Sequence, residues 1–185
     1  VHFVRTHFTA ADVTSHNMTI DTARGYAYIV KSNYSGFRIV DLSDPENPVD
    51  ISEAGTGNIH DLFARNDTVW VAEGNRSSFS IWDVSDKALP VEIAEVTIPS
   101  GGYSHNIWPS GDGRHVVTTE ETPGRTVKIW NVEDPLNIQL AGEYLASSGL
   151  AHNAHYLGDT LFISHYESGV VAVEVSDPFN PVELF

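Results

Sequence analysis

The chain contains the stretch Phe37-Arg38-Ile39-Val40-Asp41-Leu42-Ser43-Asp44-Pro45-Glu46-Asn47-Pro48-Val49, which decides the fold because it recurs. A short β-branched run leads into a turn in which Asp and Asn can bond their own backbone and Pro ends strand pairing. Related stretches begin at Phe79, Val127 and Val170. A histidine opens each of the four units. These histidines are 44, 45 and 47 residues apart, at His16, His60, His105 and His152.

Each unit contains several short runs of β-branched and aromatic residues bounded by Gly, Asn, Asp and Pro. In the first unit we expect the residues after His16 to form the innermost strand, followed by strands at 26–30, 37–41 and 49–53. A period in the mid-forties with about four short strands is typical of a β-propeller blade. Helical repeats of similar length are excluded, because their apolar residues would recur at spacings of three and four.

The sequence therefore predicts an all-β fold, a β-propeller with about four four-stranded blades. We expect one propeller region over residues 1–185, with residues 1–14 ending a preceding blade. The blades are expected near 15–57, 58–102, 103–150 and 151–185. Both ends of the chain resemble outer-strand segments, and a propeller avoids open edges by closing its ring, so we expect these blades to belong to a larger ring.

Charge and composition restrict the classes of partner. Ten Lys and Arg stand against 25 Asp and Glu, which gives a formal net charge of −15. This charge opposes binding to DNA, RNA or anionic lipid, so no nucleic-acid partner is expected. The chain has no cysteine, which excludes disulfides, thiolate metal sites and cysteine nucleophiles. No apolar run is long enough for a transmembrane helix.

The stretch at 37–48 resembles the signature of LVIVD-repeat proteins, and the histidine openings resemble those of the choice-of-anchor B family. The strand at 125–132 also resembles that family, and the resemblance covers nearly the whole chain. It implies a secreted or surface-displayed bacterial or archaeal β-propeller, with the remaining blades of the propeller as partners, and no established activity. The turns at 87–90 and 134–138 each lack one of the two prolines, which affects only the expected turn geometry.

The histidines are the main candidate site. One residue repeated in every innermost strand forms a ring around the channel of a propeller, and imidazole is the commonest metal ligand. The candidate metal ligands are therefore His16, His60, His105 and His152, and the candidate ion is divalent: Zn, Cu, Ni, Fe or Ca.

Further side chains could complete a site beside these histidines. Asp61, Asn106 and Asn153 follow the histidines and add oxygen donors. Alignment of the repeats places Lys31, Glu73, Glu121 and His165 at comparable positions after the second strand, with Glu120 adjacent. The candidate ligand-binding residues are Asp61, Glu73, Asn106, Trp108, Glu121, Asn153, His155 and His165. Trp108 is included for stacking on a ligand, although the four tryptophans, Trp70, Trp82, Trp108 and Trp130, are also expected to fill space between blades.

A structural role for the histidines is the interpretation that we favour over a ligand site. A repeated histidine at the start of a blade can simply hydrogen-bond the backbone of the neighbouring blade. The units resemble WD repeats, in which a Gly-His opening and a Trp-Asp ending correspond to His60 and to Trp82-Asp83, and the histidine there is structural. The WD network also uses an Asp between the second and third strands, which this chain does not repeat.

Two functions remain open from the sequence. The first is an extracellular or surface-associated binding or scaffold module for a protein, small-molecule or carbohydrate ligand, with or without a metal in the channel. The second is a metal-dependent enzyme, a lyase, hydrolase or oxidase, that uses the channel His and Glu residues as acid and base. The absence of a nucleophile motif favours the binding module.

Overall fold

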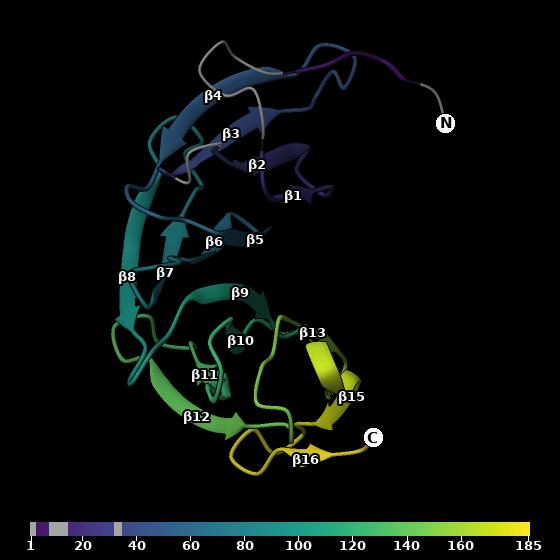
Figure 1. Cartoon of the computed structure of the whole chain (residues 1–185). Coiled ribbons are helices and arrows are strands. Elements are labelled where there is room, and N and C mark those ends of the chain that lie inside the picture. Colours follow the sequence, from purple (N-terminus) through teal and green to yellow (C-terminus); the bar gives the residue numbers. More distant parts are fainter. Residues whose placement is uncertain (1–2, 8–14, 32–34) are drawn as a thin grey trace.

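The computed structural model describes residues 3–7, 15–31 and 35–185, which form four antiparallel sheets of four strands each. Within every sheet the strands are neighbours in chain order. Figure 1 shows the sheets standing side by side in an arc, with the first strand of each sheet on the inner side and the fourth strand on the outer side. The predicted all-β propeller with four four-stranded blades is confirmed.

The strands have the following bounds. The first blade contains β1 (Met18–Asp21), β2 (Tyr26–Val30), β3 (Phe37–Asp41) and β4 (Val49–Ala54). The second contains β5 (Asp61–Arg65), β6 (Thr68–Ala72), β7 (Ser78–Asp83) and β8 (Val91–Thr97). The third contains β9 (Ser104–Pro109), β10 (His115–Glu120), β11 (Val127–Asn131) and β12 (Gln139–Tyr144). The fourth contains β13 (Asn153–Leu157), β14 (Thr160–His165), the short 3₁₀ helix η1 (Tyr166–Ser168), β15 (Gly169–Glu174) and β16 (Val182–Glu183).

The hydrophobic core is divided among the seams between blades. Successive side chains of a strand point to opposite faces, so each sheet contributes to two seams. Val69 and Val71 pack toward the first blade, whereas Trp70 between them packs toward the third. A third cluster joins Val117 of the third blade to Leu161 of the fourth. A blade therefore depends on its neighbours for burial of its apolar side chains.

The tryptophans expected between blades are mostly in these seams. Trp82 meets Phe37 edge to face, with ring centroids 5.7 Å apart, and Trp130 lies 5.2 Å from Phe79 across the next seam. Trp70 is also buried in a seam. Trp108, on the inner strand β9, is only half-buried, and it packs against the cluster between the third and fourth blades.

The turn after each third strand has one geometry in all four blades. Its Asp accepts a hydrogen bond from the backbone N–H two residues later, with N–O distances of 3.1, 2.9, 3.0 and 3.1 Å at Asp44, Asp86, Asp134 and Asp177. The turns at Asp86 and Asp134, each of which lacks one proline, therefore keep the same Asx geometry, because the aspartate rather than the proline fixes the turn.

The ends of the chain lie on outer edges of blades. Residues 182–185 continue the outermost strand: β16 pairs with β15, and Leu184 N donates to Ala172 O. Residues 3–7 lie against the first blade, where Arg5 contacts Asn47 and His7 contacts Asp50. The assignment of residues 1–14 to a preceding blade falls partly on residues 1–2 and 8–14, outside the described part of the chain. That assignment, the other blade boundaries and the larger ring stay predictions.

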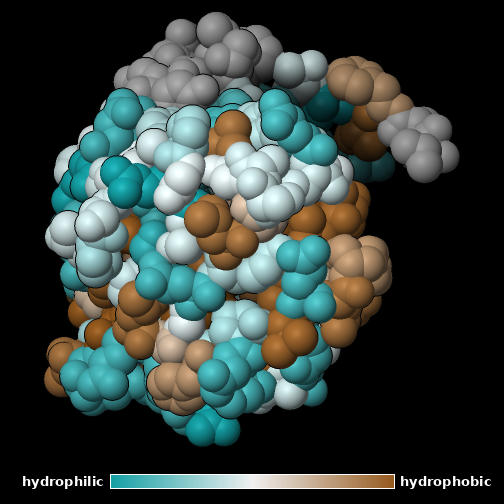
Figure 2. Space-filling model, turned by 60° about the horizontal axis from the view of Figure 1, so that its bottom comes forward, coloured by the Kyte–Doolittle hydropathy of each residue, from teal (hydrophilic) through white to brown (hydrophobic). Residues whose placement is uncertain are grey.

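Among the described residues, no helix is long and apolar enough to cross a bilayer. On the face that Figure 2 presents, hydrophobic and hydrophilic residues are interspersed.

Candidate functional site

The four histidines form one row along the inner side of the arc. They stand just before or at the start of the inner strands, where His60 N donates to Ala72 O and His152 N donates to Ser164 O. The imidazoles stack in sequence order with tilted planes. Their centroid separations are 4.4, 4.1 and 4.1 Å between His16 and His60, His60 and His105, and His105 and His152. We call these four residues the histidine row.

Imidazoles of this row bond the backbone of the next blade. His60 Nδ1 lies 2.7 Å from His105 O, and His105 Nδ1 lies 3.0 Å from His152 O. Since a carbonyl oxygen can only accept, each Nδ1 carries the proton and donates. His60 and His105 thus make the bonds to a neighbouring blade that the structural interpretation of the histidines predicted.

The same hydrogen bonds prepare a metal ligand. When Nδ1 of a neutral imidazole is protonated, Nε2 keeps its lone pair. Histidine ligands of metals commonly donate their other ring N–H to a backbone carbonyl, which fixes the ring orientation. The structural role and the ligand role of His105 are therefore compatible.

The cluster that best suits an ion consists of His105, Glu121 and His152. Each offers one ligand atom, and these atoms lie within 4.8 Å of one another. His105 Nε2 is 3.6 Å from Glu121 Oε2. Two ligands about 2.1 Å from one zinc ion at the tetrahedral angle are about 3.4 Å apart, so this pair is already near the required separation.

Burial and charge favour the protonation states of His105 and Glu121 that a metal requires. Burial lowers the pKa of His105 to about 4, and the neighbouring His60 and His152 add to the effect. A hydrogen bond from Tyr166 lowers the pKa of Glu121. A neutral imidazole at His105 beside an ionised carboxylate can bind a divalent ion without first releasing a proton.

Glu121 reaches the row because of a β-bulge. The repeat alignment makes Glu121 the equivalent of Glu73. The strand pairing shows otherwise: Asn106 pairs with Thr119 in the third blade, as Asp61 pairs with Ala72 in the second. The register of β9 and β10 then shifts between Thr119 and Glu120. Glu120 is therefore the equivalent of Glu73, and the alignment is wrong by one residue. Beyond the shift, Glu121 N donates to Tyr103 O, and the side chain of Glu121 lies beside the histidines.

Two tyrosines that the sequence did not single out complete the surroundings. Tyr166, the first residue of η1, donates its hydroxyl to Glu121 Oε1 and meets His152 edge to face at 5.5 Å. Tyr103 lies edge to face with His60 at 5.2 Å. Neither residue recurs in the repeat, so no signal in the sequence could have found them.

The oxygen donors after the histidines join blades together. Asp61 is buried and accepts from Asn17 Nδ2 at 2.6 Å, Asn106 Nδ2 at 2.7 Å and Leu62 N at 2.8 Å. Burial raises the pKa of Asp61 to about 6. Asn106 Oδ1 in turn accepts from Ala154 N of the fourth blade. Through these bonds one carboxylate and two side-chain amides link all four blades.

Asn153, the equivalent of Asn106 in the fourth blade, has a different environment. Its Oδ1 is buried and has no hydrogen-bond partner among the described residues.

Three residues of the expected second layer bond within the blade bodies. Glu73 is buried and accepts from Ser80 Oγ at 2.5 Å, and burial raises its pKa. The equivalent Glu120 pairs with Lys128. The equivalent His165 is also buried, with Nδ1 2.8 Å from Ser148 Oγ. The structure does not place Glu73 or His165 in the metal-ligand cluster.

The other two candidates belong to an aromatic row three residues further along the inner strands. Phe63 and Trp108 have centroids 4.4 Å apart, and Trp108 and His155 have centroids 4.2 Å apart. Phe63 and Trp108 are half-buried and His155 is exposed. The rings of this row lie against one another, and Trp108 and His155 stay candidates for stacking on a ligand.

Comparison with protein families assigns the repeat. Residues 18–54, which span β1 to β4, match the family model of the LVIVD repeat. The first blade is thus similar to an LVIVD repeat. The predicted resemblance is confirmed for LVIVD repeats, whereas the link to the choice-of-anchor B family stays a prediction. A search of curated proteins finds no match to the chain.

Solved structures show what the four blades resemble. The chain is similar to a candidate 6-phosphogluconolactonase from Bacteroides uniformis, with TM-score 0.76, 12% identity, and coverage of 92% of this chain and 53% of that one. It is also similar to a periplasmic gluconolactonase from Pseudomonas aeruginosa, with TM-score 0.72, 14% identity, and coverage of 91% of this chain and 55% of that one. The WD40 repeats of RRP9 give a TM-score of 0.67 at 12% identity, with coverage of 91% of this chain and 52% of that one. These likenesses show a β-propeller fold, and the chain spans about half the length of these structures.

Proposed function

We propose that this LVIVD-repeat propeller is a binding module that holds a divalent metal ion through His105, His152 and Glu121. The observation that carries the proposal is the convergence of three ligand atoms within 4.8 Å while His105 Nδ1 is committed to His152 O. Two imidazoles and one carboxylate form a ligand set used for zinc, and they leave a fourth position for a water or an oxygen of a bound partner. Calcium, which prefers oxygen ligands, suits this cluster poorly.

We further propose that the module works outside the cell or on its surface, on the basis of its likeness to LVIVD-repeat proteins. Its ligand would meet the ion at the fourth position and the aromatic row of Phe63, Trp108 and His155 beyond it. A carbohydrate or another ring-bearing molecule fits such a surface, because ring faces stack on aromatic side chains. The net charge of −15 disfavours a nucleic acid.

Elemental analysis tests the metal site directly. Protein equilibrated with zinc and passed through a desalting column should retain about one ion per chain, since three protein ligands hold it. His105→Ala combined with His152→Ala should retain none, while His7→Ala, which removes an imidazole outside the histidine row, should behave like the wild type. Equal zinc retention by all three proteins would refute the proposal.

The second candidate function is a metal-dependent hydrolase, favoured by the open coordination position and by the hydroxyl of Tyr166 on Glu121. Two structural neighbours are named for lactone chemistry, but at 12% and 14% identity they support the fold alone. Hydrolysis of glucono-1,5-lactone by the zinc-loaded protein tests this candidate. A rate equal to that of the double histidine variant would exclude this lactone as its substrate.

A further inference from the structure

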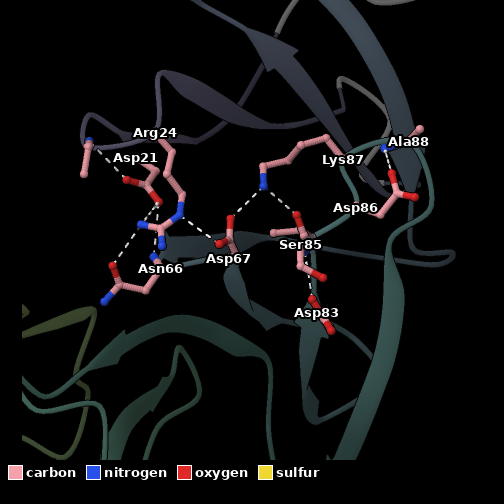
Figure 3. Close-up of polar contacts among 11 residues, drawn as sticks. Asp21, Arg24, Asn66, Asp67, Asp83, Ser85, Asp86, Lys87 and Ala88 are labelled. Carbon is pink, nitrogen blue, oxygen red and sulfur yellow. Dashed lines mark hydrogen bonds and ion pairs between the residues drawn. The ribbon is translucent and has the colours of Figure 1, made fainter.

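A lysine fills the seam between the first two blades at the end of the molecule where the third strand of each blade ends. Lys87 Nζ donates to Asp67 Oδ1 at 2.7 Å (Figure 3). It also donates to Val84 O at 2.6 Å. It also lies 4.9 Å from the centre of the Tyr26 ring, which belongs to the first blade. A carboxylate, a carbonyl and an aromatic ring thus hold one ammonium group, whose side chain is 12% exposed.

The repeat places the same receptor groups in the seam between the third and fourth blades. Val84 N donates to Asp67 O at 2.9 Å, and Val175 N donates to Asp159 O at 2.8 Å, so Asp159 and Val175 are the equivalents of Asp67 and Val84. His115, which begins β10 as Tyr26 begins β2, supplies an aromatic ring.

The lysine is replaced at this second seam. Pro178 follows Asp177 as Lys87 follows Asp86, and a proline cannot reach back into the seam. A pocket of about 360 Å³ lies there, and its lining includes His115, Asp159, Val175 and Pro178. Among the described residues no cation pairs with the Asp159 carboxylate.

Other charged groups of the pocket do not neutralise this carboxylate. Arg114 directs its guanidinium to Glu133, with an Nε–Oε1 distance of 2.7 Å. Asp112 adds a second negative charge, and its Oδ1 accepts from Ser110 Oγ and Arg114 N. The pocket therefore keeps a negative balance, in a protein whose net charge of −15 also attracts cations.

The seam between the second and third blades lacks the receptor. Val132 N donates to Arg114 O, which puts an arginine at the position of Asp67 and Asp159. A carboxylate stands at this position only in the second and fourth blades, and only the second blade has its own lysine to occupy it.

We propose that the pocket between the third and fourth blades binds an alkylammonium group, in the place that Lys87 takes two blades earlier. The Asp159 carboxylate and the Val175 carbonyl would accept its N–H groups, and the His115 ring would lie against it. The group can come from the lysine side chain of a polypeptide or from a small primary amine. This site is separate from the histidine row and does not depend on a metal.

The proposal is tested by titrating ¹⁵N-labelled protein with n-butylammonium and following the backbone amide signals. We expect saturable shifts centred on Asp159 and Val175. Asp159→Asn should weaken binding about tenfold or more, because a hydrogen bond to a charged group is replaced by one to a neutral amide. Pro178→Lys should abolish binding, because the introduced lysine occupies the pocket as Lys87 occupies its own seam. Glu92→Gln, which removes one negative charge from the exposed face of β8, is the matched control and should bind like the wild type.

Two peptides identify the source of the ammonium group. Acetyl-Gly-Lys-Gly-amide is compared with acetyl-Gly-Gln-Gly-amide, which has no charge on its side chain. If the lysine peptide binds, the glutamine peptide does not, and the variants respond as above, the pocket is assigned to a polypeptide partner. If n-butylammonium binds and the lysine peptide does not, the pocket is assigned to small amines. Shifts that are absent, or that persist unchanged in Asp159→Asn and Pro178→Lys, would overturn the proposal.

Discussion

Asp61 is the residue at which the first three blades meet. Its carboxylate accepts an amide N–H from the first blade, through Asn17, and one from the third, through Asn106. A buried carboxylate is costly unless donors surround it, and here the donors come from separate repeats. The residue therefore couples blade docking to its own protonation.

The pH dependence of stability should report this coupling. Because burial raises the pKa of Asp61 to about 6 from its ordinary value of 3.8, the folded protein holds this proton more tightly than the unfolded chain. The stabilising contribution is complete below the unfolded pKa and is lost as the pH rises through about 6. We expect the free energy of unfolding of the wild type, minus that of Asp61→Asn, to fall by on the order of 3 kcal/mol between about pH 4 and pH 6.

Urea unfolding at a series of pH values measures this difference. Taking the difference between the two proteins cancels the carboxylates whose pKa is lowered, such as Asp67 and Glu53, and whose contribution has the opposite sign. A difference that rises with pH, or that stays flat, would show that Asp61 is not buried as described.

Tyr166 should tune the proposed metal site without binding the ion. Its hydroxyl donates a hydrogen bond to Glu121 Oε1, while Glu121 Oε2 lies nearest His105. Loss of such a supporting hydrogen bond typically weakens metal affinity by about 10-fold to 100-fold. Tyr166→Phe should therefore lower zinc affinity in competition with a chromophoric chelator. Tyr144→Phe is the matched control, since Tyr144 makes the same kind of bond to Glu183 at the outer edge of the sheets. Equal affinities of the two variants would remove Tyr166 from the site.

At the scale of elements, the seams determine stability more than the individual sheets do. Trp82, on β7 of the second blade, packs against Phe37 of the first and donates through Nε1 to Ser80 Oγ, which bonds Glu73. Removing its ring opens the seam and disturbs this buried chain of hydrogen bonds.

Trp82→Ala should cost about 3–5 kcal/mol in the free energy of unfolding, the usual range for a buried aromatic side chain. Leu136→Ala, at a residue that is 90% exposed, should change it by less than about 0.5 kcal/mol. Chemical denaturation monitored by far-UV circular dichroism measures both. A cost for Trp82→Ala as small as that for Leu136→Ala would contradict the seam packing.

The strands could be predicted from sequence because they depend on local patterns that recur. The β-branched runs, the Asx turns and the histidines repeat at one period, so errors in one copy are corrected by the others. The bulge before Glu120 could not be predicted, because it occurs in one blade and has no local signature. The position of Glu121 followed from that bulge, and the contact of Tyr166 with Glu121 followed from packing between blades. The four histidines lie next to one another, as their repeated position predicted, whereas the alignment of Glu121 with Glu73 was wrong by one residue.

The whole molecule joins four blades that share their cores, so a ligand held between two of them should stabilise all four. An ion bound by His105 and Glu121 of the third blade and His152 of the fourth binds the folded state alone. At a zinc concentration 100 times its dissociation constant, this adds about 2.7 kcal/mol to the stability.

For a domain of this size, that corresponds to a rise of about 5–10 °C in Tm. Differential scanning calorimetry of the wild type and of His105→Ala combined with His152→Ala, with and without zinc, measures the rise. The double variant should show no rise, and a similar rise in both proteins would place the ion elsewhere.

The bonds of the histidine row also give the arc a mechanical property. Each bond runs from a ring in one blade to the main chain of the next, and the residue that accepts it is itself the next ring in the series. Pulling the fourth blade away from the third would therefore stretch the bond from His105 and separate the ligands of the proposed ion in the same movement. Tension between these blades would therefore weaken binding of the ion, and a bound ion would resist separation of the blades. Affinity for the ion would then depend on the curvature of the propeller.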